Sequence, residues 1–388
     1  MTVNNSRNNK GQFPTGSIIR RDFTPEIGSG WLDCDGSTLS VEDYLSLFQV
    51  IGHEYGGTGS SFTLPTSADH IIRSDGSYIQ TSVPDLWVAN TNHTFEAGAS
   101  SLLWRVRYGS DGYWAIVGRK NTNTAGTVNY TTDPTGTWSA PTSIGNFGTG
   151  EMIRTIAYSG SSWGMGGYSS DFSYKATPPS GSWTAYDLPS ENTYGGDYGY
   201  GYWASGGDGP IIFYTNTLGG SWSTATEPFT SAIKCIQYGA DGYWVAGGDG
   251  SSIATAYQVP STFTTRTSPF DAGSTICNAA YGNGYWVIVG TTGQMAYQTT
   301  APTGSWTVVD EPGPFTTSDT ILNASYGNGI WTMVGSNGKI ATRSSDPTGS
   351  WDTQTSGVTT NLVAVGYGNG CWVIGGYSGV LLYSSVTT

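Results

Sequence analysis

A tryptophan that returns at nearly regular intervals constrains the fold of this chain more than any other feature. The successive spacings are 49, 40, 41, 42, 45 and 41 residues. Each of these tryptophans is followed four residues later by glycine, and a tyrosine stands five or six residues before it. Repeats of 40–45 residues are typical of β-propeller blades, which bury their apolar faces only against one another. The seven tryptophans are Trp114, Trp163, Trp203, Trp244, Trp286, Trp331 and Trp372.

Each repeat contains the signals for four strands. The stretch "YGNGYWVIVG" at 281–290 places Asn-Gly between apolar runs, as in a tight hairpin turn. A third strand such as "QMAYQTT" follows, and then a turn such as "APTGSW" leads into a fourth. We therefore predict a mainly β chain with a seven-bladed β-propeller of four-stranded blades. The second turn carries its own aromatic residue: Trp138, Trp183, Trp222, Phe263, Trp306 and Trp351.

The seventh repeat lacks that second aromatic residue, because it would fall near position 392 of a 388-residue chain. A spare tryptophan, Trp87, stands 27 residues before Trp114. We predict that the strand near Trp87 completes the last blade and closes the ring. Closure of this kind removes two sheet edges that would otherwise promote aggregation.

Composition excludes several functional classes. The formal net charge of −13 argues against nucleic-acid binding and against an anionic membrane surface. The polar N-terminus has no apolar signal segment, and no apolar run is long enough to predict membrane insertion. Cys235 and Cys277 each precede a repeat tryptophan by nine residues, so we expect small buried apolar side chains at equivalent positions. No metal and no cofactor is predicted.

Residues 14–76 do not fit the repeat. Their features run in the order Gly16-Ser17-Ile18, Gly30-Trp31-Leu32, Cys34-Asp35-Gly36, Tyr55-Gly56-Gly57, and Phe62 with Leu64-Pro65. This segment resembles the phage tail collar domain. The stretch "SVEDYLSLFQVIG" predicts a helix capped by Ser40, and Trp31, Phe48 and Phe62 are expected to form a small core. Asp33 and Asp35 are interpreted as turn carboxylates beside Gly36 in preference to a metal or acid pair.

We therefore divide the chain into a flexible segment at 1–13, a small α+β collar-like domain at 14–80 and the propeller at 81–388. The collar resemblance implies a virion tail protein that assembles in the host cytoplasm and contacts other tail proteins. Members of that family are often trimers, so a homo-oligomer is expected.

The second turn also resembles a degenerate Asp-box of sialidase-type propellers, through Ser344, Asp346, Gly349 and Trp351. The glycine comes one place late, so the resemblance supports the fold and not an activity. No catalytic residue is predicted, although two distant carboxylates could still meet in space.

The residue directly after the repeat glycine varies around the ring, while the scaffold around it repeats. Together with the variable links between blades, which lie on the same side, it could form a ligand face. The alternative is that any polar residue suits an exposed turn. Phenylalanines of the links are interpreted as packing between blades. The predicted ligand-binding residues are Arg119, Tyr168, Asp208, Asp249 and Tyr377.

These observations favour a tail fibre or tip protein that attaches through its collar and recognises a host-surface glycan or protein through its propeller. A structural tail adaptor without receptor binding is the alternative, and a glycan-degrading enzyme is a further one. An adaptor should show an extensive apolar face, and a receptor binder should show a free polar face.

Overall fold

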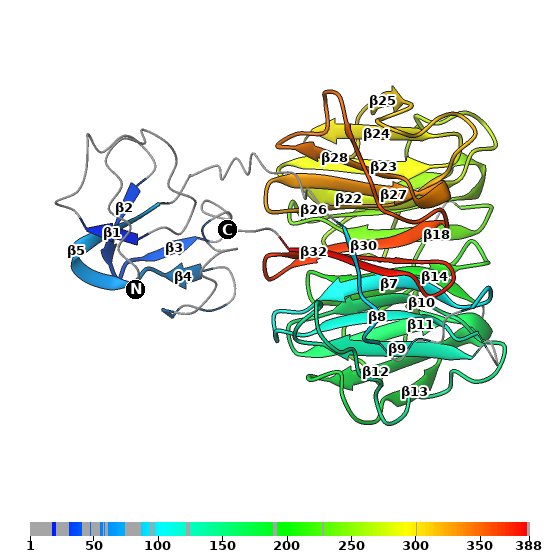
Figure 1. The fold of residues 1–388 in the computed structure, drawn as a ribbon, viewed down its shortest axis with the longest axis horizontal. Coiled ribbons are helices and arrows are strands. Elements are labelled where there is room, and N and C mark those ends of the chain that lie inside the picture. Colours follow the sequence, from blue (N-terminus) through cyan, green and yellow to red (C-terminus); the bar gives the residue numbers. More distant parts are fainter. Residues whose placement is uncertain are drawn as a thin grey trace. The chain divides into compact units, whose positions relative to one another are not determined.

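The computed structural model divides the chain into two compact units, residues 1–81 and 82–388. It describes residues 18–20, 31–40, 47, 55, 56, 58, 61–73, 87–93, 95, 98–121, 125–188, 192–226, 229–299 and 301–385. Figure 1 shows the strands of each unit.

The first unit contains two small antiparallel sheets. One has the order β1-β5-β2, from β1 (Ile18–Arg20), β5 (Thr66–Arg73) and β2 (Trp31–Asp35). The other pairs β3 (Thr38–Ser40) with β4 (Ser61–Thr63). Their core is a cluster of buried apolar side chains: Cys34, Leu47, Phe62, Leu64 and Ile72.

Several sequence-based expectations concern this unit. Phe62 lies in the core as predicted, whereas the Trp31 side chain and Phe48 lie outside the described residues. Of the predicted helix after Ser40, only Leu47 is described, and it is helical and buried. Asp35 Oδ1 accepts a hydrogen bond from Ser37 N at 2.9 Å, which confirms its role as a turn carboxylate.

The second unit is a seven-bladed β-propeller. Each blade begins with an innermost strand, and these strands are β7 (Leu102–Tyr108), β10 (Ile153–Tyr158), β14 (Thr193–Gly199), β18 (Ile233–Tyr238), β22 (Ile276–Gly282), β26 (Ile321–Gly327) and β30 (Leu362–Gly368). The second strands carry the repeat tryptophans: β8 (Trp114–Arg119), β11 (Ser162–Gly167), β15 (Tyr202–Gly207), β19 (Tyr243–Gly248), β23 (Tyr285–Gly290), β27 (Ile330–Gly335) and β31 (Cys371–Gly376).

The third strands are β9 (Gly126–Thr131), β12 (Asp171–Ala176), β16 (Ile212–Thr215), β20 (Ile253–Tyr257), β24 (Gln294–Thr299), β28 (Ile340–Ser344) and β32 (Leu381–Ser385). The outer strands are β13 (Thr184–Asp187), β17 (Ser223–Thr224), β21 (Thr264–Thr265), β25 (Thr307–Asp310), β29 (Asp352–Gln354) and β6 (Val88–Ala89). In the first blade a bridge from Tyr130 to Ser139 takes the place of an outer strand. Three second turns contain a short 3-10 helix: η2 (Tyr168–Ser170), η3 (Asp249–Ser251) and η4 (Ser336–Gly338).

The ring closes as predicted. β6 pairs antiparallel with β32, with Ala89 opposite Leu382 and Val88 opposite Tyr383. Trp87 is buried in a cluster with side chains of the sixth and seventh blades, including Trp372. The last blade is therefore built from both ends of the propeller sequence.

The core of the propeller lies between the blades. Each repeat tryptophan packs against the tyrosine that precedes it, with ring centroids 4.6–5.2 Å apart in the closest and widest pairs. The link phenylalanines are buried in clusters drawn from two adjacent blades, which confirms that they pack between blades. These residues are Phe95, Phe147, Phe229, Phe270 and Phe315.

The glycine four residues after each tryptophan is required by a close approach between strands. A Cβ on Gly290 would overlap the carbonyl oxygen of Thr275, and a Cβ on Gly248 would overlap that of Ala232. The same collision with a backbone carbonyl oxygen occurs at the equivalent glycine of every other blade, and it is mildest at Gly376, where the distance to the Asn361 oxygen would be 2.7 Å. The repeat glycine is therefore a packing requirement at the end of the second strand.

Candidate functional site

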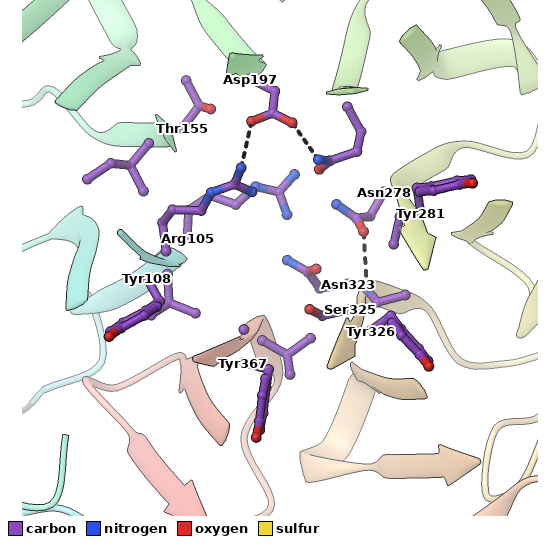
Figure 2. A pocket seen from close by; sticks show the side chains of 18 of the residues that line it. Arg105, Tyr108, Thr155, Asp197, Asn278, Tyr281, Asn323, Ser325, Tyr326 and Tyr367 are labelled. Carbon is purple, nitrogen blue, oxygen red and sulfur yellow. Dashed lines mark hydrogen bonds and ion pairs between the residues drawn. The ribbon is translucent and has the colours of Figure 1, made fainter. Parts of the chain in front are cut away.

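The innermost strands surround a central channel with a cavity of about 290 Å³. All seven innermost strands contribute to its wall. Figure 2 shows polar side chains from several blades pointing into it, among them Arg105, Asn278, Asn323 and Ser325. The cavity is close to the low end of the roughly 300–1,000 Å³ that ligand pockets occupy.

Side chains of the wall tie neighbouring blades together. Thr155 Oγ1 donates to the Gly196 carbonyl at 2.9 Å, and Asn323 Nδ2 donates to the Val363 carbonyl at 3.1 Å. Asn278 Oδ1 accepts from Ala324 N at 3.2 Å. Each bond satisfies a backbone group of the next blade, so these residues hold the channel wall in place.

The channel holds an excess of positive charge. Arg105, Arg107 and Asp197 are the charged residues that line it. Arg107 Nη2 pairs with Asp197 Oδ1 at 3.2 Å, and Asp197 Oδ2 accepts from Tyr238 N at 3.1 Å and from the Gln237 amide. Burial lowers the pKa of the Arg105 guanidinium, which nevertheless stays protonated. Among the described residues, Arg105 has neither an ion pair nor a hydrogen bond from its side chain.

A β-bulge interrupts every innermost strand near its start. The register between the first two strands shifts once in each blade, always at the residue four places before the repeat tyrosine. Bulges leave one residue outside the ladder and re-aim its side chain. We call these seven residues the bulge ring: Trp104, Arg154, Tyr194, Lys234, Cys277, Leu322 and Val363.

Neighbouring members of the bulge ring contact one another. The Arg154 guanidinium lies 4.2 Å from the ring centroid of Trp104 and 4.5 Å from that of Tyr194. Lys234 Nζ lies 4.6 Å from the Tyr194 centroid. Leu322 and Val363 join Trp104 in an apolar cluster. The ring thus has a cationic and aromatic arc in blades one to four and a less polar arc in blades five to seven.

Three of the five predicted ligand-binding residues contact the bulge ring. Tyr168 Oη accepts a hydrogen bond from Arg154 Nη2 at 2.7 Å. Asp249 Oδ2 pairs with Lys234 Nζ at 3.1 Å. Asp208 forms a side-chain hydrogen bond with Tyr194. Burial is the main cause that raises the pKa of Tyr194, and this hydrogen bond is the second. The turn that follows the second strand therefore lies on the same side as the bulges.

The other two predicted residues have different surroundings. Arg119 Nε donates to the Ser100 carbonyl at 2.9 Å, within its own blade. Tyr377 is 39% exposed, and its backbone bridges to Leu102 of the first blade. In the described part of the chain, no contact joins either side chain to the cationic and aromatic arc.

Sequence reasoning missed the bulge ring because it aligned the repeats on tryptophan. The first turn is one residue longer in blades one and four, so the bulge lies nine or ten residues before the tryptophan. This also makes the proposed equivalence of Cys235 and Cys277 wrong. Cys235 is fully buried opposite Gly247, whereas Cys277 is the bulge residue of its blade and only half-buried. Alignment on the tyrosine would have found all seven positions.

A second group of titratable residues lies in blade two, away from the channel. Asp171 is 6% exposed, and its Oδ2 has no hydrogen-bond partner in the described region. Burial, and then the neighbouring Glu151 and Asp187 carboxylates, raise the pKa of Asp171 to about 7. A raised pKa is typical of some catalytic acids, but it also follows from burial alone.

We expect Asp171→Asn to stabilise the propeller at neutral pH by about 1–2 kcal/mol. The folded state holds the Asp171 proton more firmly than the unfolded state does. Its contribution to stability therefore grows as pH falls from about 8 through the folded pKa of about 7, and levels off near the unfolded value of 3.8. Thermal unfolding of both proteins at pH 8 and pH 5 measures this, with the variant showing the smaller gain at pH 5. The matched control is Asp352→Asn, an exposed substitution on an outer strand. If the stability of D171N rises between pH 8 and pH 5 as much as that of the wild type, the raised pKa of Asp171 is contradicted.

Within the ranges that the structure describes, no group of three or more histidine, cysteine, aspartate or glutamate residues could hold a metal ion. Nor does any helix of those ranges have the length and apolar character needed to span a membrane.

Comparison with known proteins supports both units. Residues 18–71 match the family model of the Phage Tail Collar Domain. The solved structure "YCF48 bound to D1 peptide" is 15% identical, covers 79% of this chain and 96% of its own, and has a TM-score of 0.61. The structure of YCF48 from Cyanidioschyzon merolae is 15% identical, covers 77% of this chain and 98% of its own, and has a TM-score of 0.59. The WD40 beta propeller domain of Doa1 is 13% identical, covers 76% of this chain and 96% of its own, and has a TM-score of 0.58. No curated protein matches the sequence. At these identities the structural similarity establishes the propeller fold alone.

Proposed function

We propose, from the collar match at residues 18–71, that this protein is a tail fibre or tip component that recognises the host surface through the bulge-ring face of its propeller. The collar domain indicates a phage tail protein and hence a component of the virion. Attachment to other tail proteins through the collar unit, and assembly in the host cytoplasm, belong to the same proposal.

The observation that carries the proposal is the contrast between scaffold and bulge ring. The tyrosine, tryptophan and glycine positions recur in all seven blades, whereas the bulge position carries seven different residues. If the bulge ring served only to hold the blades together, side chains that pack against their neighbours would be sufficient at these positions. Cations, aromatic rings and polar turns gathered at the mouth of a channel suit a glycan, whose sugar rings stack on aromatic side chains and whose hydroxyls form hydrogen bonds.

A polar and partly hydrated surface of this size gives modest affinity at each site. Several copies on one virion would raise the effective concentration and produce firm attachment. We therefore include a homo-oligomer, with a trimer suggested by the collar resemblance, in the proposal.

The proposal contains no catalytic step. Of the residues described along the channel wall, Asp197 supplies the carboxylate, and it is already engaged by Arg107, Gln237 and the Tyr238 backbone. Glycoside hydrolysis generally requires two carboxyl groups placed across one bond.

We expect the double substitution Tyr168→Ala and Tyr194→Ala to reduce adsorption of phage particles to host cells about 10-fold or more, because it removes two rings that contact Arg154. The matched control is Tyr200→Ala with Tyr257→Ala. Those tyrosines are 52% and 55% exposed and lie at the first-turn side of the propeller.

Three outcomes separate the alternatives, provided that all variants melt close to the wild-type temperature. Loss of adsorption in the first variant alone supports the proposal. Loss in the control alone places the receptor on the opposite side. Unchanged adsorption in both, with particles still dependent on the protein for assembly, indicates a structural adaptor.

A further inference from the structure

We propose that the channel behind the bulge ring binds the oxyanion, carboxylate or phosphate, of an acidic sugar unit, and that Arg105 is the residue that contacts it. The inference rests on the proposed function, because it specifies which chemical class of host-surface glycan the propeller recognises.

Arg105 is available to an incoming anion. It projects from β7 into the channel, where Figure 2 shows its side chain among the lining residues. The one carboxylate described in the wall, Asp197, accepts hydrogen bonds from Arg107, Gln237 and Tyr238 N, and little acceptor capacity remains for a second guanidinium. Arg105 is partly buried in the channel wall and has no hydrogen-bonded partner among the described residues there, so a ligand that supplies a negative charge is favoured.

A further donor faces the same space. Asn278 uses its Oδ1 to accept from Ala324 N, which leaves its Nδ2 hydrogens for a ligand. The Arg154 guanidinium, which stacks on Trp104 and Tyr194, adds to the positive potential at Arg105, since the two cations repel each other. An oxyanion between Arg105 and Asn278 would accept from donors that the described part of the protein leaves unsatisfied.

The surroundings indicate a sugar as the carrier of the anion. Trp104, Tyr168 and Tyr194 pack around the Arg154 guanidinium, and each of the three side chains is partly exposed. A cavity of about 290 Å³ is too small for a folded peptide but admits one or two sugar units. The net charge of −13 repels anions at long range, so selectivity must come from the local cations of the channel.

The test is calorimetric titration of the full-length protein with sodium glucuronate, glucose 6-phosphate and neutral glucose. We expect at least one of the two acidic sugars to bind 10-fold or more tightly than glucose, because a hydrogen bond to a charged group contributes that much. The two acidic sugars distinguish a carboxylate from a phosphate. Arg105→Gln should abolish the preference, whereas Arg266→Gln, which removes a guanidinium bonded to Thr255 Oγ1 on an outer part of blade four, should preserve it.

The melting temperature of each variant shows whether a loss of binding results from misfolding. Because Arg105→Gln removes a partly buried charge that has no ion-pair partner among the described residues, we expect its melting temperature to equal or exceed that of the wild type. Equal binding of glucose and both acidic sugars, or a preference that survives in R105Q, overturns the inference.

Failure of this inference can be distinguished from failure of the proposed function. If no acidic sugar is preferred but the Tyr168 and Tyr194 variant still loses adsorption, the propeller recognises the host through another ligand. If Arg105 governs sugar binding while neither R105Q nor the tyrosine variant alters adsorption, the anion site is real and the host-surface role is wrong.

Discussion

Deleting residues 81–92 should leave a propeller that aggregates or melts at a much lower temperature than the wild type. The deletion removes β6 and so exposes the edge of β32, which otherwise pairs through Leu382 and Tyr383. It also removes Trp87 from the core between blades six and seven, and loss of a buried tryptophan side chain alone costs about 3–5 kcal/mol.

The deleted segment connects the last blade to the first one. Asn90 N donates to the Leu381 carbonyl at 2.9 Å, while Asn90 Nδ2 donates to the Pro134 and Gly136 carbonyls of blade one at 2.8 and 2.9 Å. Scanning calorimetry and light scattering measure the effect. A chain of residues 81–388, which retains the segment and lacks nearly all of the first unit, is the control and should melt as the intact propeller does. An unchanged melt after the 81–92 deletion would refute closure as a source of stability.

Trp286→Ala should destabilise the propeller by about 3–5 kcal/mol, the second-largest effect that we expect. Trp286 is fully buried between blades four and five and packs against Tyr281. Its Nε1 donates to Asp241 Oδ2 at 2.7 Å, across the boundary between the two blades. Burial already raises the pKa of Asp241, and the substitution also leaves its Oδ2 without the Trp286 donor, while Oδ1 still accepts from Tyr243 N.

Urea unfolding of Trp286→Ala and Trp286→Phe separates packing from hydrogen bonding. The phenylalanine variant keeps most of the ring contact and loses the N–H donor, so it should cost about 1–2 kcal/mol. If both variants lose the same stability, the bond to Asp241 dominates. A cost below about 1 kcal/mol in Trp286→Ala would show that blade packing does not depend on the repeat tryptophan.

The propeller could be predicted from the sequence because its core is built from a repeated local unit. Each tryptophan, with the glycine four residues later, marks the second strand of one blade. A single additional tryptophan, Trp87, was enough to predict how the ring closes. The link phenylalanines followed from the same reasoning, since they recur at similar distances from the second aromatic residue. Such features depend on packing that every blade must satisfy.

The candidate site was only partly predictable, because a bulge adds a single residue that residue counting from the tryptophan cannot detect. Tyr168 and Asp249 were identified from their variation, and each contacts a bulge residue that was not identified. No sequence motif distinguishes Arg105 from the other arginines of the propeller. Its importance comes from Asp197, which lies 92 positions later and is already engaged by Arg107.

The bulges bear on how a protein of this kind could change its specificity. A residue outside the hydrogen-bonded ladder can be replaced without shifting the register of the strands on either side of it. Seven such positions surround one channel, and none of them is the tyrosine, tryptophan or glycine on which folding depends. Except at Val363, which is buried in an apolar cluster, substitutions there are thus separated from the folding requirements of the blade, so a lineage can explore new surface chemistry by single amino-acid changes. A combinatorial library randomised at the other six codons would sample ligand preference with the scaffold held constant.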